Sequence, residues 1–130
     1  MNALSKQIGG GHYKDQAIQP IEFGMANRLD DCAFSTLKYV SRHATKNGLQ
    51  DLEKAYHFVE LREVLATDAH RVDEWVVTMQ DYCTVNKLPA EESAVLLELA
   101  NWLESGSPVH LYRLKIVLQD LIALRYSTNE

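Results

Sequence analysis

Apolar residues recur every three or four positions along most of this chain, and that spacing constrains the fold more than any other feature. Phe34, Leu37, Val40 and Ala44 form one such stripe. No segment shows the strict alternation of a half-buried strand, and no internal repeat is evident in the sequence. The spacing predicts an all-α fold, a compact helical bundle of about five to six helices.

Capping and breaking residues divide this pattern into separate helices. Pro20 and Pro108 suit first helical turns, and Asp30, Asp31 or Ser107 can serve as N-caps. The expected helices cover about 20–29, about 31–45, a third from near 49 to a pause at 66–68, a fourth from 68 to about 84, a fifth from about 91 to the break at 106–108, and a last one from 108 to about 126. The first 18 residues, which include three consecutive glycines, form an irregular N-terminal segment.

Charge is distributed unevenly between the two halves of the 130 residues. Residues 1–65 contain eight basic and eight acidic residues, whereas residues 66–130 contain five basic and ten acidic ones, which accounts for the net charge of −5. The acidic balance argues against a general nucleic-acid binder. We therefore expect a first domain at 1–65 and an acidic helical extension at 66–130 that packs on it.

Several classes of protein are disfavoured by what the sequence lacks. No window has the roughly 18 apolar residues that a membrane span needs, and residues 1–11 have no apolar run typical of a signal peptide. Cys32 and Cys83 lack CxxC spacing, so reduced thiols in a cytoplasm are expected. Without an HExxH motif or a Cys/His cluster, we expect no zinc, and also no haem and no flavin.

The most informative charged pattern is a line of cations on one expected helix. Lys38, Arg42 and Lys46 are spaced i, i+4 and i+8, opposite the apolar stripe, where like charges repel unless an anion neutralises them. A phosphate-bearing ligand is one such anion, because Arg offers a two-pronged fork and Lys a point charge. The alternative is an ordinary solvated helix face.

Two further features could complete a phosphate site. Asp51, at the start of the next helix, could hold Mg²⁺ together with phosphate oxygens, or could only stabilise the helix dipole. His12, Tyr13 and Lys14 follow the glycines, whose backbone can approach an anion closely, and Tyr13 could stack on a base. The alternative for this segment is a tail without a ligand, and no Walker A motif is present.

Four blocks in the first half resemble the SaV-like family of small bacteriophage proteins over about residues 9–65. They are Gly10-Gly11-His12-Tyr13-Lys14, then Ile18-Gln19-Pro20-Ile21-Glu22-Phe23, then Lys38-Tyr39 with Arg42, and finally Lys46-Asn47-Gly48 with Asp51-Leu52 and Lys54-Ala55. Ser41 departs from the family pattern, which often has a bulky aromatic inside the third block. Residues 66–130 have no recognised counterpart.

Some members of this family are described as nucleotide kinases that lack a P-loop. The resemblance therefore implies a nucleotide-handling phage protein of the host cytoplasm, possible activity as a nucleoside monophosphate kinase-like phosphotransferase, and Mg²⁺ with the nucleotide as cofactor. The resemblance implies that His12, Tyr13, Lys38, Arg42, Lys46, Asp51 and Lys54 form one site, without assigning a role to each. Taken with the residue pattern, the expected phosphate- or nucleotide-binding residues are His12, Tyr13, Lys14, Lys38, Arg42, Lys46 and Lys54, with Asp51 for Mg²⁺.

Two other functions remain open from the sequence. The protein could be a non-enzymatic inhibitor of a host defence system, such as a CRISPR effector or a nucleotide-signalling immune system. It would then bind a host protein complex through an acidic surface, or sequester a nucleotide. The candidate protein-binding residues are Asp73, Glu74, Glu91, Glu92 and Glu98. A structural homo-oligomer is the other alternative, with the wide apolar arc of 109–124 as its interface.

Overall fold

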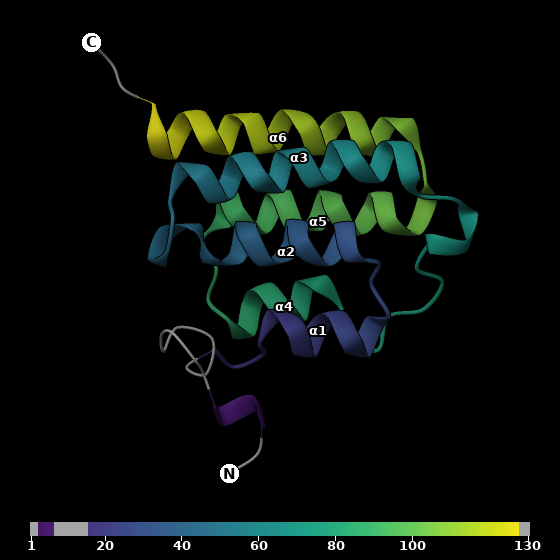
Figure 1. Cartoon of the computed structure of the whole chain (residues 1–130), viewed down its shortest axis with the longest axis horizontal. Helices are drawn as coiled ribbons and strands as arrows, with labels where there is room; N and C mark the ends of the chain where they lie inside the picture. The colour runs from purple at the N-terminus through teal and green to yellow at the C-terminus, as the bar shows by residue number, and fades with distance from the viewer. Residues whose placement is uncertain (1–2, 7–15, 128–130) are drawn as a thin grey trace.

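The computed structural model describes residues 3–6 and 16–127, and these residues form helices and no strand. The chain folds into an all-α bundle, as the apolar spacing predicts (Figure 1). The α-helices are α1 (Pro20–Asn27), α2 (Asp31–Arg42), α3 (Leu49–Leu65), α4 (Met79–Val85), α5 (Ala90–Ser105) and α6 (Pro108–Tyr126), and the 3-10 turns are η1 (Ala3–Ser5), η2 (His43–Thr45) and η3 (Asp68–His70).

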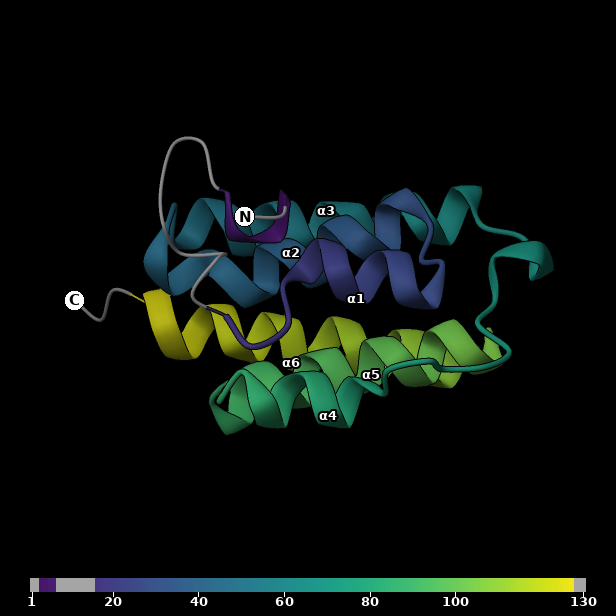
Figure 2. The ribbon, with the colours of Figure 1, turned by 90° about the horizontal axis from the view of Figure 1, so that it is seen from below.

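The helices form two layers of three. Figure 2 shows α1, α2 and α3 in one layer and α4, α5 and α6 in the other. Within each layer the middle helix contacts both of its neighbours, and across the layers α2 contacts α5 while α3 contacts α6. The order of helices along the chain is therefore the same in both layers.

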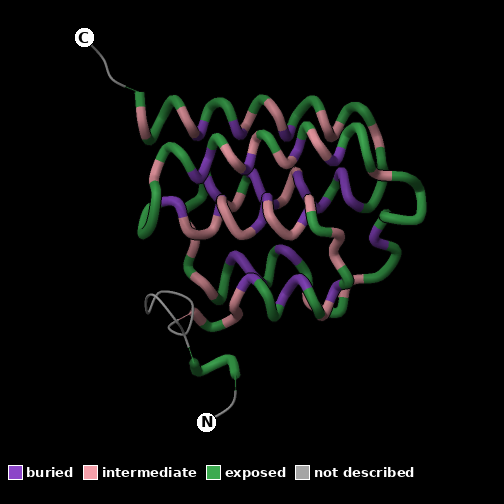
Figure 3. Tube along the Cα trace, viewed as in Figure 1, coloured by how far each residue is buried: buried purple, intermediate pink, exposed green. Residues whose placement is uncertain are grey.

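One hydrophobic core lies between the layers, and both halves of the chain contribute to it. Leu37 and Leu52 from the first half are fully buried, as are Leu96, Leu99 and Leu114 from the second. Figure 3 shows buried positions recurring turn by turn along α2, α3 and α5, the spacing that an amphipathic helix requires.

Helix α6 is not central to this core, although its sequence has a wide apolar arc. It buries Leu114, Leu118 and Leu121 on one side, while Val109 and Tyr112 are exposed on another. No helix of the described residues is long and apolar enough to cross a bilayer.

Predicted caps locate several helix ends correctly. The Asp30 side chain accepts a hydrogen bond from the Ala33 amide, so Asp30 rather than Asp31 is the N-cap of α2. Ser107 caps α6 with Pro108 at its first position. Helix α2 ends at Arg42, a few residues earlier than predicted, because the chain tightens into η2.

The predicted fourth helix over 68–84 is wrong for most of its length. After η3 the chain is extended to Thr78, and only α4 is helical. Tertiary contacts hold the extended stretch: the Val72 amide donates to the Leu103 carbonyl, and the amides of Val76 and Val77 donate to the Asn27 side chain. These distant partners satisfy backbone groups that a helix would otherwise have to pair internally.

Candidate functional site

Three cations of the first half surround one aromatic ring. Lys38, Tyr39 and Arg42 lie on α2, and Lys54 lies on the adjacent helix α3. The distances to the centroid of the Tyr39 ring are 4.6 Å from Lys38 Nζ, 4.7 Å from Arg42 Cζ and 5.5 Å from Lys54 Nζ. We call these four residues the Tyr39 cluster. The Tyr39 ring stacks on the ring of Phe58 from α3, with centroids 6.0 Å apart, and this contact fixes its position.

The cations of the Tyr39 cluster differ in their acidic partners. Arg42 Nη2 donates to Asp51 Oδ1 over 3.4 Å, and the arginine side chain is only 12% exposed. In the described part of the chain, neither Lys38 nor Lys54 forms an ion pair. Both lysines are half-buried, so their stems pack on the protein while the ammonium groups remain accessible. The cluster therefore has two positive charges with no acidic partner there.

Asp51 does not have the surroundings of a Mg²⁺ ligand. Its side chain is fully buried, and its carboxylate accepts from Arg42 and from the Asn47 amide at 3.2 Å. Mg²⁺ keeps several waters and prefers exposed carboxylates near phosphate oxygens. Among the described residues no group of three or more His, Cys, Asp or Glu side chains could hold a metal ion. Asp51 instead fixes the α2–α3 connection.

The other predicted phosphate-binding residues are not part of this cluster. Lys46 is exposed in the turn after η2, and it has no contact with the Tyr39 ring among the described interactions. His12, Tyr13 and Lys14 lie outside the described residues. A cavity of 80 Å³ beside Lys38 is also lined by Gln19, Pro20, Ile21 and Phe34.

A second polar group, which the sequence did not reveal, links the two layers. His43 Nε2 donates to Glu92 Oε2 at 2.8 Å, because a carboxylate can only accept. The other ring nitrogen of His43 is 2.6 Å from the Tyr126 hydroxyl. Arg125 donates to both Glu92 oxygens, at 3.2 and 2.9 Å, and to Glu91 at 2.7 Å. We call these five residues the His43 network.

Burial and hydrogen bonding act in opposite directions on the acid at its centre. Burial raises the pKa of the Glu92 carboxyl, but the hydrogen bonds from Arg125 and His43 outweigh it and leave that pKa below its ordinary value. Burial raises the pKa of Tyr126, and the carboxylates of Glu92 and Asp51 raise it further. At neutral pH the network therefore contains an ionised Glu92 and a neutral Tyr126 hydroxyl.

Three of the five acidic candidates for protein binding have a basic partner within the chain, and the other two lie outside the helices. Glu92 is 4% exposed and bonded within the His43 network, and Glu91 pairs with Arg125. Glu98 contacts His110 Nδ1 at 3.2 Å. Asp73 and Glu74 are exposed in the extended stretch before α4, away from the helical glutamates in sequence.

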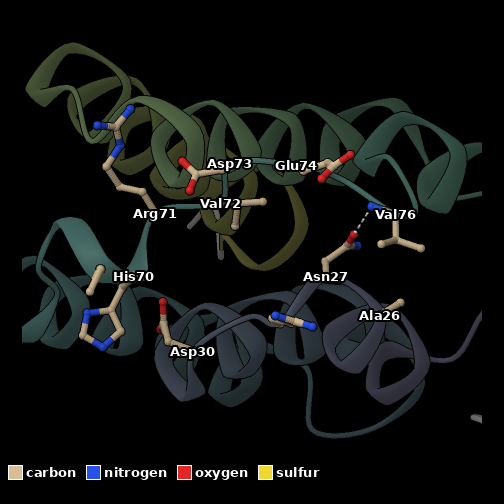
Figure 4. A pocket seen from close by; sticks show the side chains of 11 residues that line it. Ala26, Asn27, Asp30, His70, Arg71, Val72, Asp73, Glu74 and Val76 are labelled. Atoms are coloured by element: carbon tan, nitrogen blue, oxygen red, sulfur yellow. Dashed lines mark hydrogen bonds between the residues drawn. The ribbon is translucent and has the colours of Figure 1, made fainter.

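Asp73 and Glu74 line a cleft of 550 Å³ between the end of α1 and the 69–76 segment (Figure 4). Figure 4 shows them on one wall, facing Asn27 and Asp30 on the other. At one end of the cleft the two walls are joined by the hydrogen bond from the Val76 amide to Asn27 Oδ1, at 2.8 Å. Charges of both signs line this cleft, so it does not present the uniform acidic face that a basic partner would require.

Comparison with known proteins gives one family. Residues 9–60 are similar to a family described only as a protein of unknown function, DUF3310. No curated protein and no solved structure matches the chain. The matched stretch includes α1, α2 and most of α3, and with them the whole Tyr39 cluster.

Proposed function

We propose that this protein binds the phosphate groups of a nucleotide on the Tyr39 cluster. The observation that carries the proposal is the convergence of three cations on one ring, where only Arg42 has an acidic partner among the described residues. Two lysines from neighbouring helices thus lie within 5.5 Å of one ring centroid, and neither has an ion-pair partner in the described part of the chain.

Such an arrangement favours an anion on electrostatic grounds. The ring face attracts each cation, an effect worth about 0.5–1 kcal/mol at exposed sites. That attraction positions the cations at the ring without neutralising their charge, so an anion that contacts the ammonium groups further stabilises the folded protein. A phosphate group provides several acceptor oxygens for this purpose.

The resemblance to the SaV-like phage family suggests a nucleotide rather than another phosphate compound. In that case the protein acts in the host cytoplasm, either as a nucleotide kinase-like enzyme or as a protein that sequesters a nucleotide. Phosphoryl transfer depends mainly on positioning and charge neutralisation, which a cationic cluster can supply.

A thermal-shift screen with nucleoside mono-, di- and triphosphates, each with and without Mg²⁺, tests the proposal. A ligand present at 100 times its dissociation constant adds about 2.7 kcal/mol to the free energy of unfolding, which gives a clear shift of the melting temperature. We expect the double variant Lys38→Ala/Lys54→Ala to lose this shift. Arg42→Ala is a poorer test, because it leaves the buried Asp51 carboxylate without its arginine.

Arg113→Ala is the charge-matched control for the single variant Lys54→Ala, which should weaken the ligand shift. Arg113 is an exposed cation on α6, and it makes no ion pair in the described part of the chain. Removing its charge changes the net charge of the protein equally but leaves the Tyr39 cluster intact. A ligand shift that survives in the lysine double variant, or that disappears in Arg113→Ala, would contradict the proposal.

Turnover is measured separately once a nucleotide binds. The protein is incubated with a nucleoside monophosphate and ATP, and the diphosphate products are separated by ion-exchange chromatography. Formation of diphosphate that depends on Lys38 and Lys54 supports a kinase-like enzyme. Binding without product supports a protein that sequesters the nucleotide.

A further inference from the structure

The two layers are joined by two asparagines that make the same bonds in reciprocal directions. Asn27 Nδ2 donates to the Val77 carbonyl at 2.9 Å, and the Val77 amide donates back to Asn27 Oδ1 at 3.1 Å. Asn86 Nδ2 donates to the Ile18 carbonyl at 2.8 Å, and the Ile18 amide donates back to Asn86 Oδ1 at 3.0 Å. Asn86 lies 59 positions after Asn27, and Val77 lies 59 positions after Ile18.

The same offset relates other unusual features of the backbone. Among the described residues, the non-glycine positions with positive φ are Arg28 at 55° and Lys87 at 54°, again 59 positions apart. Each follows its asparagine at the end of a short helix. Phe23 and Tyr82 are also 59 apart, and their rings contact each other with centroids 4.8 Å apart. Two equivalent residues that touch must lie beside the axis that relates them.

Burial follows this offset along the longer helices. In α2, the first residue of η2 and α5, the buried pairs are Ala33 with Glu92, Thr36 with Val95, Leu37 with Leu96, Val40 with Leu99, and His43 with Trp102. In α3 and α6 they are Ala55 with Leu114, Val59 with Leu118, and Arg62 with Leu121. The contacts of α2 with α5 and of α3 with α6 are then contacts between equivalent helices, and Figure 2 shows these pairs in opposite layers.

We infer that the chain consists of two copies of one three-helix unit, related by an internal two-fold axis, and that α5 and α6 carry a second phosphate position whose charged side chains have been replaced. The first unit covers about 18–67 and the second about 77–126. The statement about the second position rests on the proposed function of the Tyr39 cluster, whereas the duplication rests on the bonds and burial alone.

The equivalent of the Tyr39 cluster has lost its aromatic ring and most of its charge. At the offset of 59, Lys38 corresponds to Leu97, Tyr39 to Glu98, Arg42 to Asn101, Asp51 to His110, and Lys54 to Arg113. Glu98 and His110 contact each other there, at 3.2 Å. One acid and one histidine thus take the place of the ring and the buried carboxylate, and only Arg113 keeps a cation.

This loss also accounts for the pattern of similarity. Three of the four blocks that resemble a known family lie in the first unit, and the family match over residues 9–60 ends before the second unit begins. The second unit keeps positions that shape the fold, such as the clamping asparagine and the leucine two residues after it. Of the three cations of the Tyr39 cluster it keeps only the one at Arg113. The structure therefore predicts one nucleotide per chain, bound by the first unit.

Matched asparagine variants of the full chain test the duplication without any ligand. Asn27→Ala and Asn86→Ala each remove a clamp, and we expect both to lower the urea midpoint, Asn27→Ala by more because Asn27 is buried and also accepts from the Val76 amide. Asn101→Ala, which changes an exposed asparagine on α5, should leave the midpoint unchanged. If either clamp variant matches the wild-type midpoint, the two clamps are not equivalent and the duplication as stated is overturned.

Calorimetric titration with ADP and with inorganic pyrophosphate tests the second position. We expect wild-type protein to bind one ligand per chain, and the variant Leu97→Lys/Glu98→Tyr/Asn101→Arg/His110→Asp to bind two. Adding Lys38→Ala/Lys54→Ala to that variant should return the number to one. Two ligands on the wild-type chain, or one on a folded four-residue variant, would overturn the inference about the second position. If wild type binds none, the proposed function fails, while the asparagine variants still decide the duplication.

Discussion

The His43 network makes a quantitative prediction about two adjacent glutamates that share one arginine. Glu92 is 4% exposed and accepts hydrogen bonds from His43 and Arg125, whereas the Glu91 side chain is 48% exposed and contacts Arg125 alone. Glu92→Gln keeps the shape of the side chain but removes its charge. A hydrogen bond to a charged group contributes about 1.5–3 kcal/mol, and the amide retains part of the bonding. We therefore expect a loss of about 1–3 kcal/mol in the free energy of unfolding.

Glu91→Gln is the control, because it removes the same charge from the neighbouring position. An exposed ion pair contributes about 0–1 kcal/mol, so this variant should stay close to wild type. Urea denaturation at pH 7, monitored by circular dichroism, measures both differences in the free energy of unfolding. Equal losses in the two variants, or a loss below about 0.5 kcal/mol for Glu92→Gln, would refute the argument that burial decides the strength of this network.

The pH dependence follows from the lowered pKa of Glu92. An acid whose pKa is lower in the folded state contributes stability above its unfolded pKa, about 4.3, and loses that contribution as the pH falls through its folded pKa. The difference between wild type and Glu92→Gln should therefore be largest at neutral pH and shrink in acid below about pH 4. A difference that grows in acid would show that the sign is wrong.

Three further predictions concern single side chains. Asp30→Ala should lower the free energy of unfolding by about 2–4 kcal/mol, because it removes the N-cap of α2 and the partner of the buried Arg62. Asp31→Ala, the control, should leave the free energy of unfolding measured in urea almost unchanged. Gly48→Ala should lose about 1–3 kcal/mol in the same assay, because φ is 59° there; an unchanged midpoint would contradict this. Burial raises the pKa of the Cys83 thiol. In a Cys32→Ser background this thiol should therefore react with Ellman's reagent at pH 7 only after the protein unfolds. Rapid reaction of the folded protein would contradict the buried position of Cys83.

The sequence predicted the parts of the fold that local rules determine. The first residues of α1, α2 and α6 follow from Pro20, Asp30 and Pro108, each of which acts through its own backbone or the next few residues. The stretch before α4 could not be predicted in this way. Val72, Trp75, Val76 and Met79 have helical spacing, but the bonds that keep the stretch extended come from Asn27 and Leu103, at least 31 positions from the residues they hold.

The candidate site was predicted in part for a similar reason. Lys38 and Arg42 share a helix face, so their proximity follows from the helical repeat. The position of Lys54 against Tyr39 depends on how α3 packs on α2, and that of Glu92 against His43 depends on contacts between layers. The inferred duplication could not be predicted from the sequence, because the two units share burial and backbone geometry far more than residue identity.

The two asparagine clamps have a consequence for how freely this sequence can change. Each clamp bonds to the backbone N–H and C=O of its target, groups that every residue except proline possesses. The side chains at Ile18 and Val77 can therefore be exchanged without loss of the bonds that fasten one layer to the other. Substitutions can accumulate in either layer while the alignment of the layers is preserved, as long as both asparagines remain.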